Sequence, residues 1–288
     1  MLTRRQLLSG GAAVVAGTAV VALYGFSESN HPQVKRIEIP LKRLPEAFDG
    51  FTIAQLSDFH YEPAFSAVPI RKSVEMVNSL RPDLVVLTGD FVTVGAFESM
   101  SHARRYAWAA AGPCAEMLRR LDARMQTFAI LGNHDADSNP GMVTDLVESH
   151  GIPVLKNQSV PIERGAARIW LAGVDDVLKG TPDIDAAIEK VPPDEAIVLL
   201  AHEPDFADEV ALTPVDLQLS GHSHGGQIWI PGIGAPWLPP LGRTYPRGLY
   251  KIERLTLYTN AGIGTIHVPI RINSVPEVTL VTLRTART

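Results

Sequence analysis

Short apolar segments that alternate with helical patterns constrain the fold of this chain more than any other feature of its sequence. Several, such as Leu-Val-Val-Leu at 84–87, are continuously apolar, as expected of strands buried on both faces. We predict strands at residues 34–39, 51–57, 84–89, 127–131, 168–174, 196–201, 215–219, 226–230, 249–252, 256–260 and 278–283. Helical patterns fall at residues 69–80, 98–121, 142–149 and 183–190. This order predicts an α/β fold with two packed sheets and helices outside them.

Residues that can bind metals are concentrated in five short segments, each directly after a predicted strand. The segments are Asp58-Phe59-His60, Gly89-Asp90, Gly132-Asn133-His134-Asp135, His202 and Gly221-His222-Ser223-His224. Because the carboxyl ends of strands converge on the ligand crevice of an open α/β sheet, we expect these side chains to lie together. Asp58 and His60 are two residues apart, as are His222 and His224, so an extended chain would point both members of each pair the same way.

The donor atoms in these segments indicate the kind of metal. Mixed Asp, Asn and His donors suit first-row divalent ions such as Mn²⁺, Fe²⁺, Zn²⁺ and Ni²⁺. Each segment alone is weak evidence, and a lone His202 is more often a structural histidine. All five segments in this order, each after a strand, are highly specific. The sequence therefore predicts a metal centre.

The ordered set resembles the calcineurin-like metallophosphoesterases, over roughly residues 50–285. The resemblance implies a four-layer α-β-β-α sandwich with two central mixed β-sheets, formed by residues 31–288, and a site for two divalent metal ions. It assigns Asp58, His60 and His224 to the first metal, Asn133, His202 and His222 to the second, and Asp90 to a bridge between them. It also implies that His134 faces the phosphate without binding a metal, and that Asp135 orients His134 by a hydrogen bond.

The activity that this resemblance implies is hydrolysis of a phosphodiester or diphosphate bond. Two cations about 3.5–4 Å apart can clamp the attacking and leaving oxygens and produce a bridging hydroxide near neutral pH. His134 would then assist the leaving group. A phosphomonoesterase and a lipid diphosphatase acting on UDP-diacylglucosamine-type compounds are alternatives. A binding module that has lost catalysis is a further alternative, which the complete set of ligands disfavours.

Departures from relatives narrow the class of substrate. The Ser/Thr protein phosphatases carry Gly-Asp-x-Val-Asp-Arg-Gly, whereas residues 89–95 read Gly-Asp-Phe-Val-Thr-Val-Gly. Purple acid phosphatases place a metal-binding tyrosine where Thr93 stands. Without the arginine, one positive group for a dianionic monoester is absent, so we expect diesters or diphosphates to be preferred. Arg271 is a candidate to bind the substrate, and a structural ion pair is the alternative reading.

The first thirty residues differ from the rest of the chain. Arg4-Arg5 precedes 22 uncharged residues, 6–27, in which Gly, Ala and Val dominate. This pattern resembles a twin-arginine export signal, and a membrane anchor is the alternative. We therefore expect residues 1–30 to be a twin-arginine-type signal or membrane anchor, with the export machinery as a partner. The enzyme would lie in the periplasm or cell envelope, as in a group of exported bacterial phosphodiesterases.

Charge and composition exclude some partners and leave one loop open to interpretation. The net charge of −5 implies no strongly basic face, so nucleic acid is not an expected partner. The single cysteine, Cys114, excludes an intramolecular disulfide. The Pro- and Gly-rich loop at residues 231–248 contains Trp237. This loop either meets a lipid-linked substrate or the membrane, or packs its own apolar residues as a cap.

Overall fold

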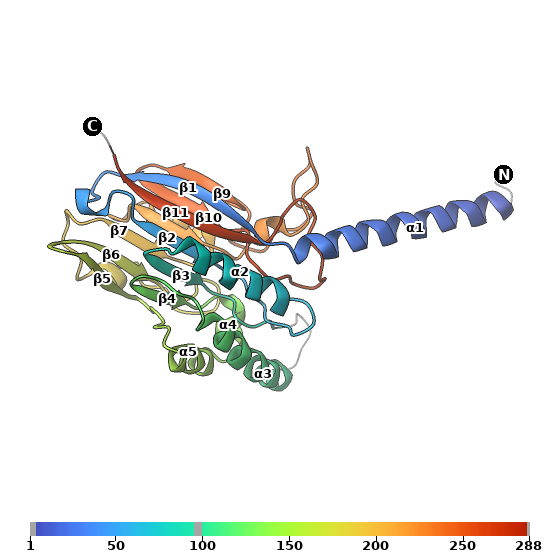
Figure 1. Ribbon diagram of the computed structural model, residues 1–288, viewed down its shortest axis with the longest axis horizontal. Helices are drawn as coiled ribbons and strands as arrows, with labels where there is room; N and C mark the ends of the chain where they lie inside the picture. Colours follow the sequence, from blue (N-terminus) through green and yellow to red (C-terminus); the bar gives the residue numbers. More distant parts are fainter. Residues whose placement is uncertain (1–3, 95–99, 287–288) are drawn as a thin grey trace.

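Two mixed β-sheets form the centre of the computed structural model, which describes residues 4–94 and 100–286 (Figure 1). The first sheet has the order β1 (Gln33–Leu41), β11 (Glu277–Thr285), β2 (Thr52–Leu56), β3 (Leu84–Thr88) and β4 (Gln126–Ile130). The second has the order β5 (Gln158–Arg164), β6 (Ala167–Gly173), β7 (Ile197–Leu200), β8 (Leu217–Ser220), β10 (Leu255–Thr259) and β9 (Gly248–Ile252). Neighbouring strands are parallel from β2 to β4 and from β6 to β10. Their carboxyl ends therefore point to one end of the molecule.

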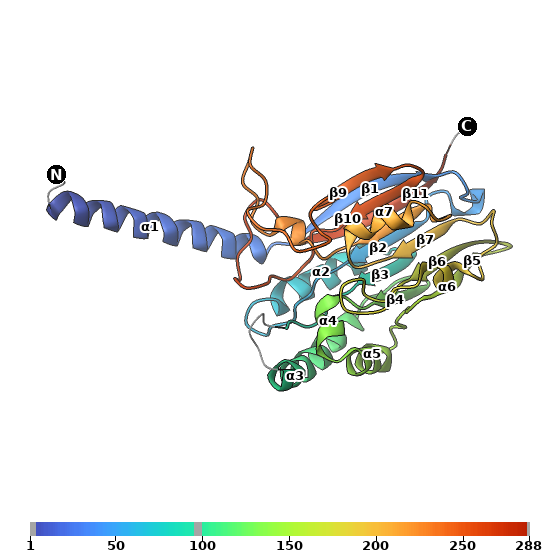
Figure 2. The same cartoon turned by 180° about the vertical axis from the view of Figure 1, so that it is seen from behind.

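Helices cover the outer face of each sheet. The first sheet packs against α2 (Ala67–Leu80), α3 (Met100–Leu118) and α5 (Pro140–Ser149), and the second against α6 (Ile184–Ile188) and α7 (Ala207–Val210) (Figure 2). Between the sheets lies a separate apolar layer that includes Phe48, Phe51 and Tyr258. The predicted four-layer α-β-β-α sandwich is confirmed, with one core between the sheets and one under each helical layer.

Four local features differ from the sequence predictions. Residues 226–230 do not form a strand, because Gly226 and Gln227 have φ of 79° and 53°, which an extended strand excludes. The sequence analysis missed β5, an edge strand that contains Pro161, and proline is tolerated only at such an edge. It also missed the short helix α4 (Asn133–Ser138). The predicted helix at 98–121 starts among residues outside the described part and ends three residues early.

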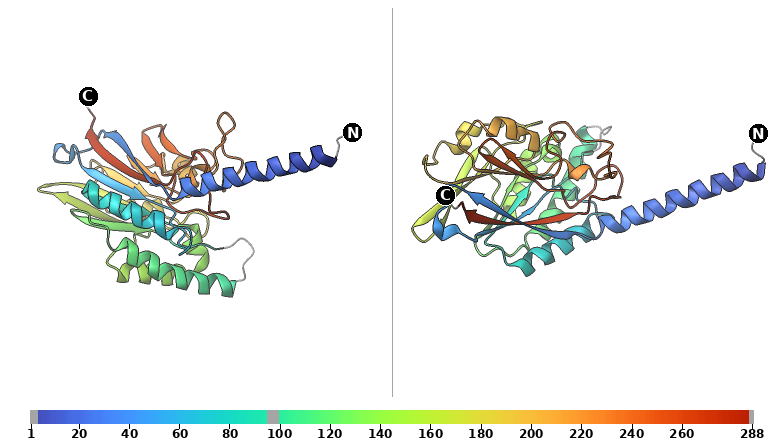
Figure 3. Two further views of the ribbon diagram at one scale, coloured as in Figure 1. Left: turned by 45° about the vertical axis from the view of Figure 1, so that its right-hand side comes forward. Right: turned by 90° about the horizontal axis from the view of Figure 1, so that it is seen from above.

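Helix α1 (Arg4–Ser29) projects from the end of the sandwich where the loop after β8 also protrudes (Figures 1 and 3). Its last turn packs on the domain, since Gly25, Glu28 and Ser29 are buried. Strand β11 ends at Thr285, at the opposite end of the sandwich. Among the helices in the described residues, none is long and apolar enough to cross a membrane.

Candidate metal centre

The seven predicted metal ligands come together at the carboxyl ends of the strands. They are Asp58 and His60 after β2, Asp90 after β3, Asn133 after β4, His202 after β7, and His222 and His224 after β8. Donor atoms lie within 4.8 Å of one another in three sets, which are Asp58/His60/His224, His60/Asp90/His134 and Asp90/His202/His222. Each sheet thus supplies part of the centre. The sharing of Asp90 and His60 between sets is the arrangement expected of two adjacent ions.

The backbone turns sharply at most of these ligands. Asp58, His60, Asp90, His222 and His224 have φ between 41° and 70°, the left-handed region that non-glycine residues rarely adopt. The expectation that each two-residue spacing lies on an extended chain is therefore wrong. The turns aim the side chains instead. Such backbone conformations are concentrated at functional sites, where surrounding structure holds them in place.

Two glycines allow the ligand segments to approach one another. A Cβ on Gly221 would lie 1.9 Å from Ser57 Oγ and 2.4 Å from Asp58 Oδ2. A Cβ on Gly132 would lie 2.4 Å from Asp90 Oδ1. Neither contact is sterically allowed, so only glycine fits at these positions. The two sheets can therefore bring their carboxylates and imidazoles into one cluster.

Asp90 lies in the middle of the cluster. Its Oδ1 accepts a hydrogen bond from the backbone N–H of His134 at 2.9 Å. Its Oδ2 lies 3.1 Å from His202 Nε2 and 3.4 Å from His60 Nε2. Burial alone raises the pKa of Asp90, but the surrounding histidines, His202 foremost, hold it well below its usual range. A buried carboxylate between histidines of both sheets has the charge and position to bridge two cations.

The histidines assigned to the second metal each have one ring nitrogen held by a backbone carbonyl. His202 Nδ1 donates to the Thr88 carbonyl oxygen at 2.6 Å, which directs Nε2 towards Asp90 Oδ2, 3.1 Å away. Burial lowers the pKa of His202, but the neighbouring carboxylates, Asp90 foremost, together outweigh burial and raise this pKa well above its usual value, so the buried Nε2 is a basic atom that a cation would bind in place of a proton. His222 Nε2 donates to the Pro240 carbonyl at 2.8 Å, which leaves its Nδ1 beside Asn133 Oδ1 at 2.9 Å. A cation would satisfy these donors, so the residues fit a metal.

The donors assigned to the first metal converge in the same way. His60 Nε2 and His224 Nε2 are 3.0 Å apart, and His224 Nε2 is 3.4 Å from Asp58 Oδ1. Thr93 Oγ1 lies 3.0 Å from His60 Nδ1 and sets the orientation of that ring. Burial lowers the pKa values of His60 and His224 well below the usual value, and that of His222 to about 4. These rings are neutral at pH 7, which is the form that binds metals.

His134 has a different hydrogen-bond pattern from the ligand histidines. Its Nδ1 accepts the Val94 N–H at 2.9 Å, so the neutral ring carries its proton on Nε2. A ring in this state has no lone pair for a metal, but it has a donor for an oxygen of the substrate. The predicted role of Asp135 as its orienting partner is wrong. Asp135 accepts hydrogen bonds from the backbone N–H groups of Phe91, Val92 and Gly132, and it fixes the loops rather than the ring.

Arg271 does not reach the surface of the site. The side chain is completely buried, and its guanidinium donates to the backbone carbonyls of Gly264, Ala261, Ser274 and His224. Burial lowers its pKa to about 10, so it stays charged at neutral pH. This arrangement disfavours the predicted contact with substrate. It also differs from the alternative ion pair, because the partners are carbonyl dipoles.

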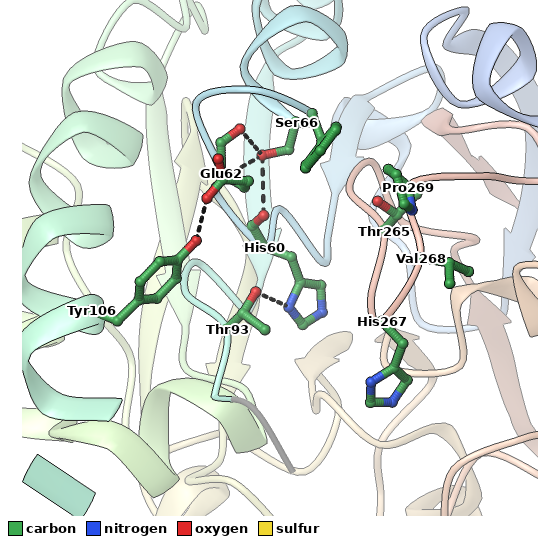
Figure 4. A pocket seen from close by; sticks show the side chains of 10 residues that line it. His60, Glu62, Ser66, Thr93, Tyr106, Thr265, His267, Val268 and Pro269 are labelled. Atoms are coloured by element: carbon green, nitrogen blue, oxygen red, sulfur yellow. Dashed lines mark hydrogen bonds between the residues drawn. The ribbon is translucent and has the colours of Figure 1, made fainter. Parts of the chain in front are cut away.

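A hollow of about 300 Å³ with a mixed lining opens beside His60 (Figure 4), and we call it the polar hollow because it carries polar side chains such as Glu62 and Thr265. Glu62 and Tyr106 form a hydrogen bond on one side, and Thr265 and His267 lie on the other. The sequence analysis did not single out Glu62 or Tyr106. Their separation of 44 residues left no local signal, although Glu62 directly follows the Asp58–His60 segment. This hollow therefore borders the candidate metal centre at His60.

Known proteins resemble this chain over most of its length. A family model described as "Calcineurin-like phosphoesterase" matches residues 51–226. The chain is 32% identical to "Uncharacterized metallophosphoesterase YkuE" of Bacillus subtilis, over 98% of each chain. It is 29% identical to "Phosphodiesterase YaeI" of Escherichia coli, over 98% of this chain and 100% of that protein. It is 34% identical to "Transmembrane protein with metallophosphoesterase domain" of Danio rerio, over 93% of this chain but only 61% of that protein.

Proposed function

The chain belongs to the calcineurin-like phosphoesterases, and on this premise we propose that it is a metal-dependent phosphodiesterase that hydrolyses a phosphodiester or diphosphate bond. The family is one of hydrolases that use two divalent ions, and the described residues hold a donor set for both. The name of the Escherichia coli relative supports the diesterase activity. The observation that carries the proposal is the Nε2–H of His134 beside this donor set.

When bound, the two ions would supply positive charge for the phosphoryl oxygens and lower the pKa of a coordinated water. The chain's own residues do the rest. Asp90 holds the two halves of the centre together by its position between His60 and His202. His134 directs its Nε2–H at the departing oxygen and stabilises the charge that develops there by a hydrogen bond, and it keeps its proton because the Val94 N–H occupies its Nδ1. Asp135 keeps the loops of both residues in register through three backbone hydrogen bonds.

The charges around the centre favour diesters over monoesters. None of the described residues that line the polar hollow is Lys or Arg, and Glu62 adds a carboxylate there. The Arg271 side chain is buried in the protein, and its N–H groups donate to backbone carbonyls. A monoester dianion would therefore meet less compensating charge than it needs, whereas a diester carries one negative charge fewer. The same argument applies to the internal phosphorus of a diphosphate.

The proposal is tested by comparing kcat/KM for p-nitrophenyl phosphate and bis-p-nitrophenyl phosphate. The purified full chain is loaded with Mn²⁺, Zn²⁺ or Ni²⁺ and its metal content is measured in each case. We expect a preference for the bis ester with at least one metal. A preference for the monoester with every metal overturns the diesterase proposal and favours a phosphomonoesterase. Two bound metals with no turnover of either ester favour the non-catalytic alternative.

We also propose that the chain is exported by the twin-arginine route and works in the cell envelope. The support is the Arg4-Arg5 pair before an uncharged stretch, together with the helix that residues 4–29 form. Changing both arginines to lysine retains the charge and removes the feature that this route reads. We expect export of the double variant to stop, measured by cell fractionation. Normal export of the double variant overturns the route but leaves the location intact.

A further inference from the structure

A second hollow, of about 200 Å³, lies on the other side of His267 and Val268 from the polar hollow. Its walls are almost entirely apolar, with Ile228, Trp237 and Ile266 as the large side chains. The candidate ligand His224 forms part of its wall, just as His60 forms part of the wall of the polar hollow. Because the Nε2 atoms of these two histidines are 3.0 Å apart, each hollow borders one of two adjacent candidate ligands.

The walls of the apolar hollow are fixed by hydrogen bonds between two loops. Trp229 N–H donates to the Ile272 carbonyl at 2.8 Å, and Ile272 N–H donates to the Gln227 carbonyl at 2.9 Å. The ring of Trp237 meets the ring of His267 edge-on at 6.0 Å. Trp237 nevertheless remains 57% exposed. A large aromatic side chain that is held at the mouth of an apolar hollow and left partly in water is typical of a binding surface.

We propose that the apolar hollow binds an aliphatic or aromatic substituent of the phosphoester, while the polar hollow binds the hydrophilic one. The substrate is then an amphiphilic phosphodiester whose phosphate lies between His60 and His224. This inference rests on the proposed phosphodiesterase function and specifies its substrate class. Because the candidate ligand His224 forms part of its wall, a part of the substrate is the favoured occupant, rather than a separate ligand.

A series of p-nitrophenyl alkyl phosphates with methyl, butyl and hexyl chains tests this inference. Complete burial of one methylene group strengthens binding by on the order of fourfold. Because the hollow is partly open, we expect kcat/KM to rise by roughly two- to fourfold for each methylene added to the chain. Trp237→Ala should flatten the series. Ile233→Ala is the matched control, because Ile233 lies on the same loop, is 79% exposed and does not line the hollow. A wild-type enzyme that cleaves all three esters equally overturns the inference and leaves the phosphodiesterase function standing.

Binding without turnover separates the two failures. The dissociation constants of methyl-, butyl- and hexylphosphonate for the metal-loaded chain are measured by calorimetry. We expect affinity to rise with chain length in the wild type and in Ile233→Ala, and to rise much less in Trp237→Ala. This result supports the hollow even if no diester is cleaved, in which case the proposed function alone has failed. Equal affinities along the series overturn the hollow as a subsite.

An independent observation concerns the last turn of α1, which is joined to the segment that supports His224. Arg271 N–H donates to the Gly25 carbonyl at 3.0 Å, and Ser274 N–H donates to Glu28 Oε1 at 2.9 Å. Ser29 Oγ donates to the Pro269 carbonyl at 3.2 Å. Glu28 is buried, so this contact is part of the domain interior rather than a surface association.

The same segment holds the backbone of a metal ligand. Ser274 Oγ donates to the His224 carbonyl at 2.9 Å, and Arg271 Nη1 donates to it at 3.3 Å. Arg271 Nη2 also lies 3.4 Å from His224 Nδ1. An unbroken path therefore runs from Glu28 through Ser274 to the His224 carbonyl. His224 needs this support because its φ of 54° is unfavourable for a non-glycine residue.

We infer that the last turn of α1 positions His224, so that residues 25–30 belong to the working enzyme. Any cleavage of a leader must then fall before Gly25, or the helix is retained. Glu28 acts as a positioning residue, since it touches neither metal nor substrate and acts through Ser274. This boundary lies inside residues 1–30, the segment predicted from the sequence to be a twin-arginine-type signal or membrane anchor.

Substitutions at Glu28 in the full chain test this inference. Glu28→Ala should lower the affinity for one of the two metal ions by roughly 10–100-fold, which is the usual effect of losing a residue that supports a metal ligand. Glu28→Gln keeps an oxygen for the Ser274 N–H and should stay near wild type. Leu23→Ala, on the same helix and 71% exposed, is the control. Unchanged affinity for both metals in a folded Glu28→Ala protein overturns the inference.

A second measurement does not depend on how the variants fold. The N-terminus of the enzyme isolated from its native cells is determined by mass spectrometry, together with its metal content. We expect a first residue at or before position 25. A native chain that begins after residue 30 and binds two metals with wild-type affinity overturns the role of this turn.

Discussion

The buried floor of the metal centre and its exposed rim hold their side chains in different ways. We define the floor as the seven candidate ligands with Asp135, and the rim as the loop at residues 231–248. In the floor, every ligand histidine has a neighbour that sets its orientation, such as Thr88 for His202. In the rim, Ile233 and Trp237 are largely exposed.

This difference separates the two tasks of the site. The floor must hold charged and polar groups against the cost of burial, so each donor and acceptor needs a partner. Around Ile233 and Trp237 the rim presents apolar area, which tolerates changes of shape, whereas its Pro240 carbonyl helps to hold His222. Substitutions in the floor should therefore reduce catalysis, metal binding or stability, whereas substitutions of the exposed apolar side chains of the rim should change which substrates react. Four variants, taken from the largest expected effect to the smallest, test this separation.

Asp90→Asn should have the largest effect, because it removes the charge placed between the histidines of both sheets. We expect kcat to fall by ~10³-fold or more and metal content to drop below two ions per chain, since the ions' contribution is worth several kcal/mol. Turnover assays and elemental analysis measure both effects. A variant with two metals and wild-type kcat would remove Asp90 from the floor.

His134→Ala should lower kcat by about 10²–10³-fold, the usual contribution of a hydrogen-bond donor placed at a developing oxyanion. Both metals should stay bound, because the Val94 N–H occupies the lone pair of the ring. The loss should shrink for substrates with good leaving groups, whose departing oxygen needs less stabilisation. Loss of one metal in this variant would show that His134 is a ligand after all, and the division between ligands and donor would then be wrong.

Asp135→Asn should act on stability more than on chemistry. The Asp135 carboxylate accepts hydrogen bonds from the backbone N–H groups of Phe91, Val92 and Gly132. In the Asn variant the amide NH₂ group would replace one carboxylate oxygen, so a donor would face a donor. We expect a loss of about 1–3 kcal/mol in the free energy of unfolding, or roughly 2–10 °C in Tm. Calorimetry of the full chain gives the value, and Asp137→Asn, the same change in the same helix at a side chain that is 40% exposed, is a matched control. An unchanged Tm would mean that these bonds add little.

Ile233→Ala marks the other end of the scale. The side chain is 79% exposed on the rim, so the free energy of unfolding should change by less than about 0.5 kcal/mol. The kcat for bis-p-nitrophenyl phosphate should stay at the wild-type value with both metals bound. A fall in metal content or Tm would show that the rim supports the floor, and the separation of the two regions would fail.

The sequence predicted the metal centre well because its signals are local. A ligand after a strand end, such as Asp90 after β3, needs only the strand to be recognised, and continuous apolar runs identify buried strands. The two-sheet architecture followed from the same runs. The backbone conformation at the metal ligands could not be predicted. The left-handed conformations of Asp58 and His224 depend on tertiary contacts, and alternation rules assume an extended chain.

Contacts between residues far apart in the sequence were the other features that could not be predicted. Asp135 stands next to His134, which made a direct hydrogen bond between them plausible, but its acceptors are taken by the loop after β3. Arg271 was a candidate to bind the substrate, with a structural ion pair as the alternative, because its charge is visible in the sequence and its burial is not. Pro161 concealed β5 for a similar reason, since only its position at a sheet edge makes that proline acceptable.

The chain ends lie at opposite ends of the sandwich, and this has a practical consequence (Figure 1). Strand β11 finishes at Thr285 on the side away from α1 and from the protruding loop after β8. A biotin or affinity handle added behind that strand would attach the protein to a sensor chip with its catalytic mouth facing the flowing solution. Immobilisation through the N-terminus would instead crowd that mouth against the surface. The choice of handle thus decides whether captured protein can meet large or aggregated ligands.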